Sequence, residues 1–63
     1  MLSEKIRKLR KEKGYSQEKL ARKADVSMRT INIIEAGKIA NPHVDTVTRI
    51  AKGLGIELSE LLE

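Results

Sequence analysis

Apolar residues recur every three or four positions along most of the chain, which is the spacing of one face of an α-helix. The first such stripe contains Leu2, Ile6 and Leu9 and predicts a helix over about 2–13. Gly14 ends this pattern, since glycine readily adopts the left-handed backbone that closes many helices. The residues that start and end the later helices leave no stretch of the chain for strands. The pattern alone therefore predicts a small all-α domain.

Serine residues mark the starts of the next two helices. Ser16 and Ser27 precede helices that we expect over about 17–24 and 28–36, because a serine side chain can accept a hydrogen bond from a free amide of the first turn. Gly37 supplies a left-handed stop after the second of these helices.

A later stripe predicts a fourth helix over about 44–53, ended by Gly55. Its apolar positions are Val44, Val47, Ile50, Ala51 and Leu54. Gly53 is expected to weaken the last turn by about 1 kcal/mol relative to alanine. A short fifth helix, beginning near Glu57 or Ser59, holds Leu58, Leu61 and Leu62.

The segment 17–37 has the pattern of a helix-turn-helix. Small and apolar residues stand where two short helices that cross over a tight turn need contacts: Leu20, Ala21, Ala24, Val26, Ile31 and Ile34. The second helix of such a unit enters the DNA major groove and presents its outward side chains to base edges. Double-stranded DNA is therefore the first partner to consider.

Charge supports this interpretation without deciding it. The 63 residues carry a net charge of +4, but residues 1–40 hold 11 basic and 5 acidic side chains, whereas residues 41–63 hold 2 and 4. A basic region suits DNA phosphates, whose neutralisation supplies most non-specific affinity. A solvated lysine-rich helix surface is the plainer explanation of the same charges.

Several function classes find no support in the sequence. The chain has no cysteine and a single histidine, His43, so we expect no disulfide, metal site or cofactor. It has no glycine-rich phosphate loop and no nucleophile with a plausible base, and we expect no enzyme. No apolar run is long enough to cross a bilayer or to resemble a signal peptide, which favours a soluble cytoplasmic protein.

Short motifs in order and spacing resemble the phage-repressor (Cro/XRE-type) helix-turn-helix family over nearly the whole chain. They are Gly14-Tyr15-Ser16-Gln17, Leu20-Ala21, Val26-Ser27, Thr30-Ile31, Ile34-Glu35-Ala36-Gly37, Asn41-Pro42 and the segment 50–56. The resemblance implies one domain over 1–63, a compact five-helix bundle that binds operator-like DNA as a homodimer and regulates transcription, commonly as a repressor. The chain departs from the family at Asp25, where glycine is usual, and at Met28 and Ile33, where polar side chains are common.

Four residues of the second helix of this unit are candidates for reading bases. A turn of 100° per residue places Arg29, Asn32 and Ile33 on the outward arc, with Met28 near the start of the helix. Arg29 can bond guanine O6 and N7 together or contact a phosphate, and Asn32 can read adenine or reach a phosphate. Ile33 suits either a thymine methyl group or a protein surface.

Phosphate contacts are expected on both sides of these readers. Gln17 stands at the start of a helix, where free N–H groups favour an anion. Lys38 and Asn41 lie in the loop after the helix 28–36, and His43 precedes the next helix start. Together they would grip the DNA backbone on either side of the groove.

Two further sets of residues are assigned structural roles. Arg10 closes the apolar stripe of its helix and Glu35 neighbours the inward residues of another, so we expect these charges to pair, as they do in proteins that the chain resembles. A homodimer would use the end of the chain, since the helix 28–36 must stay free for the groove. The expected dimer residues are Ile56, Leu58, Leu61 and Leu62.

A protein-interaction module on the same fold is the alternative, as in an antitoxin or a contact for a coactivator. Met28, Ile33 and Ile39, with the apolar end of the chain, could form its surface. Salt separates the two functions, because phosphate-driven binding weakens steeply as salt rises and apolar association changes little.

Overall fold

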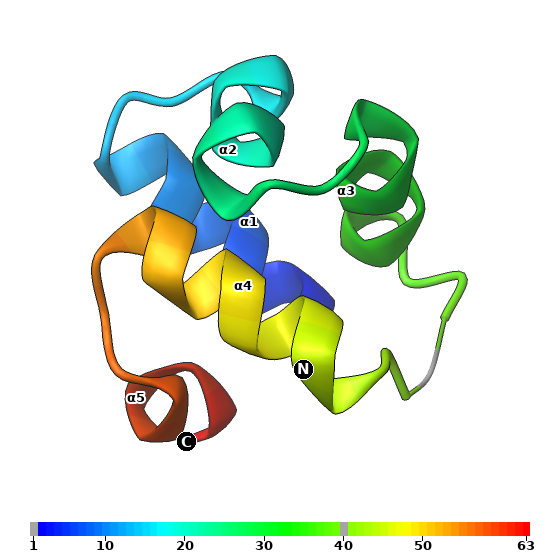
Figure 1. Ribbon diagram of the computed structural model, residues 1–63, viewed down its shortest axis with the longest axis vertical. Coiled ribbons are helices and arrows are strands. Elements are labelled where there is room, and N and C mark those ends of the chain that lie inside the picture. Colours follow the sequence, from blue (N-terminus) through cyan, green and yellow to red (C-terminus); the bar gives the residue numbers. More distant parts are fainter. Residues whose placement is uncertain (1, 40) are drawn as a thin grey trace.

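The computed structural model describes residues 2–39 and 41–63 and folds them into helices joined by short turns (Figure 1). In chain order these are α1 (Leu2–Glu12), α2 (Gln17–Ala24), α3 (Met28–Glu35), α4 (Val44–Leu54) and α5 (Leu58–Leu62). The described residues contain no strand, so the prediction of an all-α bundle of five helices is confirmed. Helices α1 and α3 end one residue earlier than expected, and α4 ends one residue later.

The two serines cap their helices as expected. Ser16 Oγ accepts a hydrogen bond from the Lys19 amide at 3.0 Å, and Ser27 Oγ accepts one from the Thr30 amide at 3.1 Å. Each bond satisfies an amide that has no partner within its own helix. The starts of α2 and α3 are therefore fixed by local sequence.

The turn between α2 and α3 depends on a left-handed residue. Asp25 has φ 58° and is the one residue other than glycine with a positive φ among the residues described. Its amide bonds the Arg22 carbonyl at 3.3 Å, and the Val26 amide bonds the Ala21 carbonyl at 3.0 Å. Aspartate tolerates this backbone better than most residues, which allows the turn to form without glycine.

One apolar core joins the helices. Its fully buried members with large side chains are Ile6, Leu20, Ile31, Ile34, Ile50, Leu54 and Leu61. Val44, expected at the start of the α4 stripe, is instead 62% exposed, so the buried stripe of this helix begins at Val47. The first residue of α4 lies beyond the edge of the core.

Helices α2 and α4 approach each other closely at Gly53. A Cβ atom placed on Gly53 would lie 2.9 Å from the Ala24 backbone nitrogen and 3.1 Å from the Ala24 Cβ. Real Cβ atoms do not pack that closely, so glycine is what allows the two helices to meet. The expectation that Gly53 only weakens its helix is incomplete, because the residue also has a packing role.

Helix α3 lies at the edge of the molecule. In Figure 1 it is the green helix beside α2, and it packs against both α2 and α1. Helix α5 packs against α1 and α4 at the other end of the bundle, near the C-terminus. The fold thus supports α3 from behind and leaves its outer side open.

Candidate nucleic-acid interface

Helix α3 divides into a buried side and an open side. Ile31, Ile34 and Glu35 are buried, whereas Arg29 and Asn32 are exposed and Met28 is 54% exposed. This division places three of the four expected base readers on the accessible surface. The fourth, Ile33, is only half-buried and lies at the boundary between the two sides.

The structure brings Arg10 and Glu35 together across the α1–α3 contact. Arg10 Nε donates to Glu35 Oε2 at 2.7 Å, and Arg10 Nη2 donates to Glu35 Oε1 at 3.0 Å. This bidentate arrangement is among the stronger kinds of charged hydrogen bonding in proteins. Arg10 Nη1 also donates to the Tyr15 carbonyl at 2.8 Å. The hydrogen bonds to Glu35 raise the pKa of Arg10, so the guanidinium stays charged although the pair is largely buried.

This ion pair continues as a chain of hydrogen bonds to the open side of α3. The Gln17 amide nitrogen donates to Glu35 Oε1 at 3.1 Å, and Asn32 Nδ2 donates to Gln17 Oε1 at 3.3 Å. Two residues that were assigned to DNA separately, one to phosphate and one to bases, are therefore joined. One N–H of the Gln17 amide remains for a ligand, because an amide nitrogen carries two hydrogens.

The other expected phosphate residues lie on the surface between α3 and α4. Lys38, Asn41 and His43 are all exposed. His43 Nδ1 accepts a hydrogen bond from the Asp45 amide at 3.2 Å and so caps α4. A phosphate could then be reached only by the other ring nitrogen of His43, a restriction that the sequence did not indicate.

Arg49 is a residue that the sequence reasoning missed. From α4 it donates through Nη1 to the Asp25 carbonyl at 3.0 Å, and the same atom lies 3.6 Å from Asp25 Oδ2. Its Nε lies 3.3 Å from Asp45 Oδ2, one turn earlier in the same helix. The spacing of Asp45 and Arg49 is a visible signal for the second contact, but nothing local indicates the first, which holds the turn between α2 and α3.

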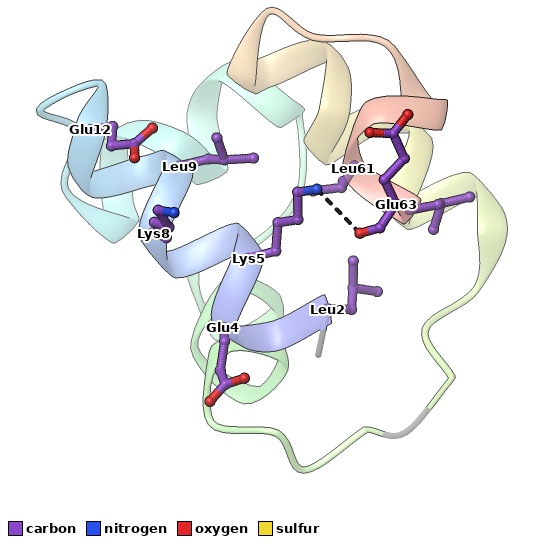
Figure 2. Close-up of a pocket in the computed structure, with 9 residues that line it drawn as sticks. Leu2, Glu4, Lys5, Lys8, Leu9, Glu12, Leu61 and Glu63 are labelled. Atoms are coloured by element: carbon purple, nitrogen blue, oxygen red, sulfur yellow. Dashed lines mark hydrogen bonds between the residues drawn. The ribbon is translucent and has the colours of Figure 1, made fainter.

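The four expected dimer residues have different surroundings. Leu61 is 1% exposed and belongs to the core of its own chain, so it has almost no surface to offer a second chain. Ile56 and Leu58 are half-buried against the same core, while Leu62 is 59% exposed. Leu62 also lines a groove of about 490 Å³ between α1 and α5, which Figure 2 shows.

Neither a metal centre nor a membrane-spanning helix occurs among the described residues. No group of three or more histidine, cysteine, aspartate or glutamate side chains is placed to hold a metal ion in residues 2–39 and 41–63. Within the same ranges, every helix is too short or too polar to cross a membrane.

Comparisons with known proteins agree with this geometry. The chain is 33% identical over 63 residues to the HTH-type transcriptional regulator SinR of Bacillus subtilis (strain 168), covering 100% of this chain and 57% of that protein. It is 38% identical over 63 residues to the regulator SlrR of the same organism, covering 100% and 41%. The chain thus spans about half the length of the curated relatives it matches.

A solved structure and a family model extend this agreement. The crystal structure of the biofilm regulator SinR in complex with DNA matches with a TM-score of 0.92 at 33% identity, covering 100% of both chains. The helix-turn-helix family model matches residues 6–61, from the first turns of α1 to α5. The chain therefore belongs to the helix-turn-helix family that its sequence resembles, the Cro/XRE-type family of phage repressors.

Proposed function

We propose that this chain binds double-stranded DNA sequence-specifically, as a homodimer that places α3 in the major groove, and that it regulates transcription in the manner of a repressor. The observation that carries the proposal is the division of α3: Glu35 and two isoleucines anchor it, and Arg29 and Asn32 stand free of the core. A SinR structure that superposes over the whole chain is a complex with DNA. We place this function in the cytoplasm and in one domain over 1–63.

Arg29 is the proposed main reader of base edges. Its side chain is exposed, and its planar donors can bond guanine O6 and N7 together, a contact worth about 1–3 kcal/mol of discrimination. Asn32 would read adenine with the oxygen and the second N–H that its bond to Gln17 leaves available. Met28 and Ile33 would supply apolar contact to thymine methyl groups.

The proposed phosphate contacts position α3 in the groove. They come from Gln17 at the start of α2, from Lys38 and Asn41 after α3, and from His43 through its outer ring nitrogen. Such contacts fix the register of the protein on the duplex and carry little sequence information.

We place the dimer contact on α5, where Leu62 is the most exposed of the expected residues. Ile56 and Leu58 would contribute at its edge, with Leu61 packed behind it in the core. A twofold dimer of this kind requires two half-sites about one helical turn of DNA apart. The Leu62→Gln variant tests the contact, with Val44→Gln as the matched control, because Val44 is similarly exposed on another helix. Sedimentation on DNA should show one protomer per duplex for the first variant only; equal stoichiometry for both would remove α5 from the dimer.

Selection of the purified chain against random duplex DNA at near-physiological salt tests the function directly. A twofold-symmetric enriched motif is the expected result. The Arg29→Gln variant should lose preference at one base pair of each half-site, whereas Lys38→Gln should weaken binding to all duplexes alike. If no motif is enriched and weak binding vanishes as salt rises, the specific function is refuted.

An apolar protein-binding surface is the second candidate, and the exposure of four large apolar side chains among the described residues favours it. These are Met28, Ile39, Val44 and Leu62. Association through them would change little between low and high salt, in contrast to binding to phosphates. A salt titration of duplex binding therefore separates the two functions.

A further inference from the structure

The basic side chains of α1 fall on two sides of the helix with different neighbours. Arg7 and Lys11 line a hollow of about 330 Å³ that opens beside α3, where Asn32 also contributes to the lining. Lys5 and Lys8 line the groove on the side of α5. Lys5 Nζ donates a hydrogen bond to the Glu63 carbonyl, 3.2 Å away, which is the dashed line in Figure 2.

The hollow beside α3 is electropositive because its charges do not cancel. Arg10 and Glu35 form part of its lining but neutralise each other through their two hydrogen bonds. Arg7 and Lys11 remain, both exposed, and no side chain of residues 2–39 and 41–63 forms a hydrogen bond or ion pair with either.

These two free cations are also neighbours on the helix surface. Positions 7 and 11 are four residues apart and so lie one above the other, where like charges repel and weaken a helix. Because no acidic side chain of the described residues pairs with either cation, an anion bound there would relieve the repulsion. An arginine can give two parallel bonds to a phosphate, and a lysine adds a compact charge.

We propose that Arg7 and Lys11 together bind one backbone phosphate group of duplex DNA, which extends the DNA-binding surface from α3 onto α1. This inference rests on the proposed function and adds a site to it. The shared hollow supplies the geometry: Asn32, on the open side of α3, and the two cations of α1 line the same depression. A strand whose bases are read by α3 would therefore pass its backbone over these cations.

The test compares two double variants with the same loss of charge, at α1 and at the residue that follows it. Arg7→Gln/Lys11→Gln removes the proposed contact. Lys8→Gln/Lys13→Gln is the control, since Lys8 faces the α5 groove and Lys13 follows the last turn of α1. Affinity for a fixed duplex is measured over a range of salt concentrations, and circular dichroism checks that both variants are folded.

Loss of one phosphate contact in each protomer should reduce the magnitude of the slope of log affinity against log salt by about 0.9 for every protomer on the duplex. We expect this reduction, with an affinity loss independent of DNA sequence, in Arg7→Gln/Lys11→Gln alone. Equal changes in both double variants would show that α1 supplies only a general field and would overturn the inference.

Two further outcomes distinguish failure of the phosphate site on α1 from failure of the proposed DNA binding on which it rests. Wild-type chain that binds no duplex would refute the proposed function and this site with it, whereas wild-type binding with an unchanged slope in the α1 variant refutes the site alone. Inorganic phosphate is the second probe, followed by amide chemical shifts of residues 7–11. Saturable binding of that ion, lost in Arg7→Gln/Lys11→Gln, would assign a free-phosphate site and overturn the assignment to DNA.

Discussion

Two arginines hold the α2–α3 unit against the rest of the chain, in opposite surroundings. Arg10 of α1 bonds Glu35 at the end of α3 at 2.7 Å, with side chains 11% and 3% exposed. Arg49 of α4 approaches the carboxylate of Asp25, in the turn, only to 3.6 Å, with side chains 47% and 96% exposed. The same two chemical groups, a guanidinium and a carboxylate, thus pair in the interior in the first case and in water in the second.

The comparison teaches that the burial of an ion pair, more than its presence, decides how much the pair contributes to stability. An exposed pair contributes about 0–1 kcal/mol, because water already solvates both charges. Loss of one partner from a buried pair costs about 3–5 kcal/mol, because the other charge is left desolvated. Arg10 and Glu35 therefore fix how α1 packs against α3. Arg49 contributes less to stability, through its contacts with the turn between α2 and α3.

The largest expected effect is that of Arg10→Met. It should lower the free energy of unfolding by about 3–5 kcal/mol, since Glu35 loses its charged partner in a buried position. Urea or thermal unfolding measures this, and a loss no greater than that of Arg49→Met would break the comparison. In the double variant Arg10→Met/Glu35→Leu most of the stability should return, because no buried charge is left unpaired.

The next largest effect is expected at the contact between α2 and α4, which involves no charged group. Gly53→Ala should lower the free energy of unfolding by about 1–3 kcal/mol, because the added methyl group would meet the Ala24 backbone and overpack the α2–α4 contact. This loss should exceed the gain of about 1 kcal/mol that alanine brings to a helix interior. Lys52→Ala, exposed on the same helix, is the control in thermal unfolding. A stabilised Gly53→Ala would show that the helices are not so close.

Arg49→Met should cost about 1 kcal/mol or less, since it removes two exposed ion pairs, with Asp25 and Asp45, and one bond to the Asp25 carbonyl. Its effect on urea unfolding should shrink in high salt, whereas the effect of Arg10→Met should not. Equal salt dependence of the two variants would contradict the contrast between them.

The smallest effect is expected for Asp25→Asn. Asparagine tolerates the left-handed backbone at φ 58° and removes only the charge, so the free energy of unfolding should change by about 0.5 kcal/mol or less. The difference between this variant and Arg49→Met, measured by urea unfolding, gives the combined contribution of the bond to the Asp25 carbonyl and of the Arg49–Asp45 pair. A larger loss in Asp25→Asn would mean that the exposed pair is stronger than its surroundings allow.

Spacing and capping predicted the helices well, because both signals are local. Ser16 and Ser27 mark two helix starts by a hydrogen bond three residues away, and the apolar stripes mark which face turns inward. The pattern does not say which element an inward or polar face will meet. The contact of Arg49 with Asp25 and the close approach at Gly53 join α4 to the turn after α2 and to the last residue of α2, and only the tertiary arrangement brings these together.

The site was predictable to the same extent. Helical periodicity placed Arg29 and Asn32 on an open face, and the structure has both exposed. It could not show that the Gln17 amide turns toward Glu35, because that contact crosses 18 positions of sequence. Leu61 was expected at a dimer surface because the sequence shows only that the last helix has an apolar stripe. The same stripe can pack against the core of its own chain or against a second chain.

The hydrogen bond between Asn32 and Gln17 has an evolutionary consequence. Asn32 cannot be exchanged alone without leaving the Gln17 oxygen to find another donor, and through Gln17 the change reaches the buried pair. Arg29 has no such tie to the described residues. Under the proposed function, a lineage descended from this protein could acquire a new target by single changes at position 29, whereas new preferences at position 32 would have to arise together with changes at position 17.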